Sequence, residues 1–161
     1  MARECYGAEA EPAEWWAWYL FGLDSTTNRI VMARRGAETI GMQPLMISAY
    51  QHGKAQLKGA VLCAGMVHPS FRRQGVFRRL IAAALEEAWR LGADFAVLGP
   101  VRATPSHPER APLGWEGFLD AARGAAMPVF TLGGITLADM ETAWSCGAHG
   151  VAMMRGAWSE D

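Results

Sequence analysis

The spacing of apolar residues first becomes helical near Val76, and no other feature of this chain limits the fold as strongly. Before it, from Arg29 to Val67, apolar and polar residues alternate in short runs, which is typical of half-exposed strands. After it, the segment Val76–Leu91 has apolar residues three and four apart, which indicates an amphipathic helix that ends at Gly92. Strand-like and helix-like segments then alternate. The pattern predicts an α/β fold with a mixed sheet, in which an antiparallel meander continues into parallel β-α-β-α-β units.

The boundaries follow from the same patterns. Strands are expected at Arg29–Ala33, Thr39–Met42, Leu45–Tyr50, Gln56–Val67, Phe95–Leu98, Val129–Leu132 and Val151–Met154, and helices at Val76–Leu91, Trp115–Arg123 and Leu137–Cys146. Thr136, with Asp139 three residues later, predicts an N-terminal cap for the last helix. Because no repeat or low-complexity linker separates the two parts, residues 1–161 are expected to form one continuous domain.

The order of the segments also predicts how the faces of the sheet are covered. Right-handed crossovers that advance in one direction place their helices on one face, so the three helices should share a face. The Trp15–Phe21 segment is too apolar to be exposed and is expected in the core or as cover for the other face. The last strand, Val151–Met154, would be an unprotected apolar edge, which predicts self-association through residues 151–154.

Composition argues against several classes of function. The formal net charge is −1, so the chain lacks the excess of basic residues that is typical of proteins that bind nucleic acid or an anionic membrane. A small-molecule ligand is expected instead. No apolar run reaches the roughly 18 residues of a membrane span. Cys5, Cys63 and Cys146 lack paired spacing, which predicts buried thiols in a cytoplasmic protein rather than disulfides. The four histidines show no ligand spacing, so no metal site is assigned.

One short segment has the chemistry of an anion site. Arg72-Arg73-Gln74-Gly75-Val76-Phe77 lies between the strand that ends near Val67 and the start of the long helix. A helix N-terminus offers unpaired N–H groups and the positive end of a dipole. A glycine lets a pyrophosphate approach the backbone, and Arg72, Arg73, Arg78 and Arg79 add positive charge. A basic loop before a helix can also be ordinary solvated surface, and that alternative remains open on the spacing alone.

Residues 14–98, with this motif, resemble the GNAT superfamily of acyl-CoA-dependent N-acetyltransferases. The family pattern is Arg/Gln-x-x-Gly-x-Gly/Ala, and Arg72-x-x-Gly75-x-Phe77 fits it except that Phe77 replaces a small residue. The resemblance implies that CoA or acetyl-CoA binds at Val67, Arg72, Arg73, Gln74, Gly75, Val76 and Phe77. The family's first strand and its closing helix and strands have no counterpart here. The general acid cannot be mapped, so the catalytic residues stay unknown.

Residues 94–161 resemble the C-terminal half of thiamine-phosphate synthase, a (β/α)8 barrel. The matching blocks begin at Leu98-Gly99-Pro100-Val101 and end at Gly147-Ala148-His149-Gly150-Val151-Ala152. The resemblance implies a phosphate-binding site at Thr104, Ser106, His107, Gly133, Gly134, Met154 and Arg155. Magnesium would be used only if this activity is present, and its carboxylate ligands belong to the missing half of the barrel. Gly133 and Gly134 could equally serve a tight turn.

Together the two resemblances imply a GNAT-like half joined to half of a TIM barrel, and three hypotheses for function remain. The first is an acyl-CoA-binding, GNAT-like N-acetyltransferase, or a remnant that only binds CoA. The second is a phosphate-ester-binding segment similar to thiamine-phosphate synthase. The third is a catalytically silent chimera. Both parent families are transferases, so a transferase-like protein is the common expectation.

Overall fold

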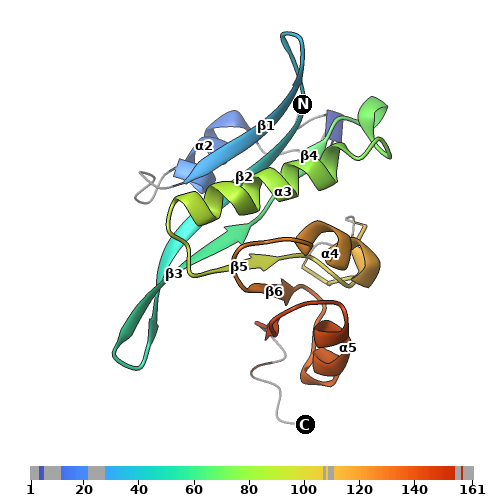
Figure 1. The fold of residues 1–161 in the computed structure, drawn as a ribbon. Coiled ribbons are helices and arrows are strands. Elements are labelled where there is room, and N and C mark those ends of the chain that lie inside the picture. The colour runs from blue at the N-terminus through green and yellow to red at the C-terminus, as the bar shows by residue number, and fades with distance from the viewer. Residues whose placement is uncertain are drawn as a thin grey trace.

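The computed structural model describes residues 4–5, 12–21, 28–106, 108, 111–154 and 157. Within them, seven strands form one sheet in the order β1-β2-β3-β5-β6-β7, with β4 paired to β2 (Figure 1). The strands are β1 (Arg29–Arg35), β2 (Glu38–His52), β3 (Ala55–Leu62), β4 (Met66–Val67), β5 (Phe95–Leu98), β6 (Val129–Leu132) and β7 (Val151–Ala152). The helices are α2 (Ala13–Phe21), α3 (Val76–Arg90), α4 (Gly114–Ala122) and α5 (Met140–Ser145), with 3-10 turns η1 (Pro69–Phe71) and η2 (Leu137–Asp139).

The strand directions confirm the predicted fold class. β1, β2 and β3 are antiparallel neighbours, whereas β3, β5, β6 and β7 pair in parallel. The helix α3 connects β4 to β5, α4 connects β5 to β6, and η2 with α5 connects β6 to β7. The described part of the sheet is open, and the half-barrel geometry is not confirmed.

The predicted division of the antiparallel part into strands is wrong on both sides of a single irregularity. The expected strand Gln56–Val67 is interrupted at Cys63–Gly65, which gives β3 and β4. In the register, Leu45 pairs with Leu62 and Met42 with Met66, so two residues of β2 lie opposite three residues of the broken strand. Such a bulge bends a strand. Opposite the bulge, β2 runs without a break, although two separate strands were expected on either side of Gln43-Pro44. A proline is tolerated inside a strand at such an irregularity.

The three crossover helices share one face of the sheet, as predicted. A single buried cluster contains Leu85 from α3, Phe118 from α4 and Ala143 from α5, together with inward-facing residues of β2, β3, β5 and β6. The helix α3 covers β1 and β2 and also contacts α4. Figure 1 shows α3 lying across the sheet, with α4 and α5 toward the β6 end. The core therefore lies between this helix layer and the sheet.

The opposite face carries a row of aromatic side chains. The rings of Tyr50 and Phe95 lie 5.1 Å apart, and those of Phe95 and Phe130 lie 5.8 Å apart, both edge to face. Gly59 lies beneath this row, because a Cβ there would be 2.5 Å from ring atoms of both Tyr50 and Phe95. The glycine allows the rings to pack closely across β3.

Other expectations are confirmed or corrected locally. Thr136 and Asp139 form the predicted capping box at the start of η2. The last strand is shorter than expected, because only Val151–Ala152 pairs with β6. Trp18 is 58% exposed, so it is not a core residue, although Trp15 and Tyr19 stack on each other at 4.9 Å. The three cysteines, all within the described part of the chain, are thiols that are partly rather than fully buried.

Candidate functional site

The bulge between β3 and β4 opens the sheet at its centre. β3 pairs with β5 as far as Leu62 and Leu98, and after the bulge β4 pairs with β2. Ala64, inside the bulge, has a φ of 50°, which turns the chain away from the β5 direction. The segments that follow β3 and β5 therefore diverge, and a cavity of about 700 Å³ lies between them.

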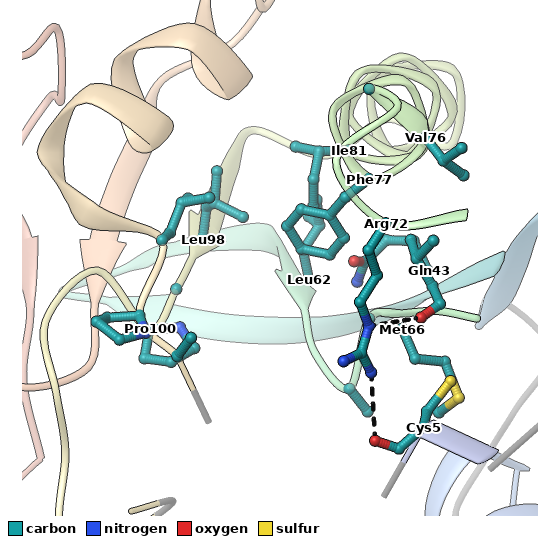
Figure 2. Close-up of a pocket in the computed structure, with 18 of the residues that line it drawn as sticks. Cys5, Gln43, Leu62, Met66, Arg72, Val76, Phe77, Ile81, Leu98 and Pro100 are labelled. Atoms are coloured by element: carbon teal, nitrogen blue, oxygen red, sulfur yellow. Dashed lines mark hydrogen bonds between the residues drawn. The ribbon is translucent and has the colours of Figure 1, made fainter. Parts of the chain in front are cut away.

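The cavity is bounded by the sheet below, by the start of α3 on one side and by the segment before α4 on the other (Figure 2). A volume of this size is typical of small-molecule sites. The described residues that line it are Cys5, Gln43, Leu62, Ala64, Gly65, Met66, Val67, Phe71, Arg72, Arg73, Gly75, Val76, Phe77, Ile81, Leu98, Gly99, Pro100, Ala111, Pro112 and Leu113.

Gln43 holds the bulge in place, and sequence reasoning missed it. Its side chain is only 1% exposed, and its Nε2 donates hydrogen bonds to the carbonyl oxygens of Pro44 (2.8 Å) and Cys63 (3.0 Å). Its Oε1 lies so close to Gly65 that a Cβ at that position would overlap it. The only available signal was a polar residue at an inward position of an apolar strand.

The turn between β4 and α3 brings Gly75 to the mouth of the cavity. Gly75 caps α3 with a φ of 72°, and a Cβ there would meet nothing within 4 Å. No side chain caps the helix, and its first turn contains no acidic residue. The N–H groups at the start of an α-helix have no intrahelical partner, and they carry partial positive charge. The N–H groups at the start of α3 are therefore open to approach beside Gly75.

The predicted arginine cluster is only partly assembled there. Arg72 and Arg73 line the cavity, but Arg72 also donates from Nε to the carbonyl oxygen of Val67 (3.2 Å) and from Nη2 to that of Cys5 (3.4 Å). Arg78 points to α4, where it pairs with Asp120 at 3.0 Å. Among the predicted contacts, Val67, Val76 and Phe77 line the cavity.

Gln74 does not join these residues. Its Nε2 donates to the carbonyl oxygen of Ser70 at 3.0 Å, so the side chain folds back onto its own turn. Gln74 is absent from the described wall of the cavity, unlike Gly75 and Arg73 on either side.

The residues of the predicted phosphate-binding site follow the carboxyl ends of β5, β6 and β7, at the same edge of the sheet as the cavity. Thr104 and Ser106 follow β5, Gly133 and Gly134 follow β6, and Met154 follows β7. Because these three strands are parallel, the segments after them are neighbours. Met154 is 70% exposed, and the amide of Ser106 donates to Oγ1 of Thr104 at 3.4 Å. His107 and Arg155 lie outside the described residues.

The two glycines after β6 serve a close backbone approach. Arg102 donates its N–H to the carbonyl oxygen of Gly133 at 3.0 Å, and a Cβ on Gly133 would be 2.5 Å from Cβ of Pro100. A Cβ on Gly134 would overlap the carbonyl oxygen of Ala103. The segment after β5 thus packs directly on these glycines. Both also have positive φ values, 89° and 66°, as the tight turn that the sequence left open requires.

An ion pair fixes this contact. Nη1 of Arg102 lies 2.6 Å from Oδ1 of Asp139, and Oδ2 of Asp139 accepts from the amide of Thr136 (2.9 Å) and from its hydroxyl (3.0 Å). Burial raises the pKa of Asp139, but the hydrogen bonds from Thr136 and the charge of Arg102 outweigh burial and hold that pKa below its usual value. Asp139 therefore ties η2 to the segment after β5.

Comparison with known proteins identifies the larger part of the chain. A family model described as an acetyltransferase (GNAT) domain matches residues 1–116, which is more than half of the sequence. The chain belongs to the GNAT acetyltransferase domain family. A solved structure of ribosomal-protein-alanine N-acetyltransferase from Brucella melitensis biovar Abortus 2308 is 17% identical, with a TM-score of 0.40 over 53% of this GNAT chain and 59% of that chain.

The second half of the GNAT chain is similar to another family. A model described as thiamine monophosphate synthase matches residues 80–157. Thiamine-phosphate synthase from Thermosynechococcus vestitus is 40% identical over 74 residues, which is 46% of this chain and 21% of that protein. Putative thiamine-phosphate synthase 2 from Aquifex aeolicus is 39% identical over 61 residues, 38% of this chain and 33% of that protein. The chain thus matches a third or less of the length of these relatives.

The chemistry that the cavity of this GNAT chain provides is limited. Its ionisable lining residues, within the described part of the chain, are Cys5, Arg72 and Arg73. Burial raises the pKa of the Cys5 thiol, and the nearby charge of Arg72 offsets this only in part. The thiol is therefore protonated at neutral pH, and arginine does not release its proton. The described wall therefore contains no general base.

Elsewhere in the described chain, no group of three or more His, Cys, Asp or Glu side chains is arranged to hold a metal ion. The residues that the structure describes therefore offer no magnesium site. No described helix combines the length and apolar character that crossing a membrane requires.

Proposed function

We propose that the protein binds CoA thioesters in the cavity between β4 and β5, as an N-acetyltransferase-like member of its family. The observation that carries the proposal is the position of the bulge. It opens the sheet directly beside the uncapped N-terminus of α3, so an extended ligand reaches an anion site and an interior cavity at once. Membership in the GNAT family supports the same conclusion.

In this proposal each part of the ligand has named partners. The pyrophosphate binds the N–H groups at Val76 and Phe77, with Arg73 nearby and Gly75 leaving room for it. The pantetheine arm lies along Met66 and Val67. Acetyl-CoA supplies an activated acyl group as a thioester, and the protein positions it. Because the described wall offers no general base, transfer to an acceptor amine is expected to be slow.

Calorimetric titration with CoA tests the proposal through two matched glycines. Gly75 and Gly36 have similar backbone angles, with φ of 72° and 60°, and a Cβ at either would meet nothing within 4 Å. Gly75→Glu and Gly36→Glu therefore impose the same backbone strain and the same added charge, but only Gly75 is at the cavity. CoA binding should be lost in Gly75→Glu and kept in Gly36→Glu. Equal affinities in the two variants would refute the proposed site, and no binding by the unmodified protein would favour a catalytically silent chimera.

The alternative, a phosphate-ester site at Thr104, Ser106, Gly133 and Gly134, is supported by the match of residues 80–157 to thiamine monophosphate synthase. The close packing on the two glycines leaves little room for a phosphate there. The same titration, repeated with thiamine phosphate, distinguishes the two sites by which ligand binds.

We also propose that the protein is cytoplasmic and self-associates through its last strand. Three thiols are in keeping with a reducing compartment. Within the described sheet β7 pairs only with β6, and the partly buried Val151 and Ala152 present an apolar edge to a second copy.

A further inference from the structure

The cavity between β4 and β5 is chemically divided. Its charged lining residues, within the described part of the chain, are Arg72 and Arg73, in the turn that leads to Gly75. The rest of its lining is mostly apolar and includes Phe77, Pro100 and Leu113, whose surfaces are at least partly exposed. A ligand that fits both parts is anionic at one end and apolar at the other.

The apolar part offers nothing to a cationic amine. A desolvated ammonium group needs a carboxylate or several acceptors, because burying an unpaired charge costs several kcal/mol. The described lining contains no carboxylate and no imidazole, and the nearest charges are two arginines. An acceptor amine is therefore not expected inside this part of the cavity.

Phe77 adds apolar surface at the boundary between the two parts. Its ring reaches into the cavity beside Ile81 in Figure 2, and a Cβ on Gly65 would be 2.9 Å from Cε2 of the ring. The side chain is nevertheless 37% exposed. An apolar chain lying against this ring would remove the exposed surface from water, which is favourable in proportion to the area covered.

We propose that the cavity selects acyl-CoA molecules whose acyl chain is longer than acetyl, with Phe77, Pro100 and Leu113 in contact with the chain. This inference rests on the proposed CoA site and adds the substrate class. Binding is expected to need both the anionic nucleotide head and the apolar chain. A free fatty acid also has an anionic end and an apolar chain, so the test must distinguish it from an acyl-CoA.

The test is calorimetry with CoA, acetyl-CoA, butanoyl-CoA and hexanoyl-CoA, and with hexanoate alone. Affinity should rise by up to about fourfold for each added methylene that becomes buried, and thus on the order of 100-fold from acetyl-CoA to hexanoyl-CoA. Phe77→Ala should flatten this dependence on chain length. Trp89→Ala is the matched control, because Trp89 is also an exposed aromatic residue of α3 (52%) but does not line the cavity, and it should leave the dependence unchanged.

The outcomes separate this inference from the proposed function. Equal affinity for CoA, acetyl-CoA and hexanoyl-CoA would overturn the chain-length selection and leave the CoA site standing. Failure of every CoA compound to bind would overturn both. Hexanoate that binds as tightly as hexanoyl-CoA would show a fatty-acid site and contradict the requirement for the nucleotide head. A steep dependence in Phe77→Ala as well would remove Phe77 from the set of chain contacts.

Discussion

Replacing Gln43 should show how much the bulge depends on one buried amide. In Gln43→Met the side chain keeps nearly the same volume but loses two hydrogen bonds, to the carbonyl oxygens of Pro44 and Cys63. Each buried hydrogen bond contributes about 0.5–1.5 kcal/mol, so the free energy of unfolding should fall by about 1–3 kcal/mol. For a chain of this size that corresponds to a decrease in Tm of roughly 3–10 °C.

The control is Gln51→Met on the same strand. Gln51 also donates from Nε2 to a backbone carbonyl, that of Gly53 at 2.6 Å, but it is exposed, so its loss should change Tm by little. Differential scanning calorimetry of both variants gives the comparison. CoA affinity should also fall in Gln43→Met, because the wall that Gln43 supports is less well ordered. If the Tm of Gln43→Met matches that of Gln51→Met, the proposed support of the bulge by Gln43 is wrong.

Three further predictions concern the second half of the chain. The pKa of Asp139 is lower in the folded state, so its contribution to stability is complete above the unfolded value near 3.8 and is lost as pH falls through the folded value. Urea unfolding between about pH 5 and pH 3 should therefore show a smaller loss of stability in Asp139→Asn than in the unmodified protein. An equal loss in both proteins would contradict the lowered pKa. The protein should form no thiamine phosphate from the two substrates and magnesium, since it matches at most a third of the relatives cited above; product above background in a chromatographic assay would refute this. Ala152→Lys should shift light scattering toward the monomer, and an unmodified protein that is already monomeric at high concentration would exclude association through β7.

Local patterns were sufficient for much of the fold. The helix α3 was predicted to within one residue at its end, because its apolar residues repeat at helical spacing and Gly92 follows. The strands β5 and β6 were predicted with their observed bounds, since short apolar runs flanked by turns are local features. Gly75 was expected to leave the backbone approachable at the start of α3, and its left-handed conformation there was not predicted.

The features that shape the site depend on contacts between distant segments. The bulge at Cys63–Gly65 arises because β2 pairs with both β3 and β4 in different registers, and the run from Gln56 to Val67 alone reads as one strand. Arg78 was counted with the anion site, but its partner Asp120 lies on another helix. The reason for glycine at position 134 is likewise a segment that packs on it from after β5. The spacing of apolar residues along the chain reveals none of these contacts between distant segments.

The most direct test of the central claim is an NMR titration that follows backbone amide signals as CoA is added. The account predicts that the largest chemical-shift changes occur at Gly75, Val76 and Phe77, followed by Met66 and Val67 along β4. The amides of the segment after β6 should change little. Changes centred on that segment, from Gly133 to Ile135, would place the phosphate in the other half of the chain and contradict the account.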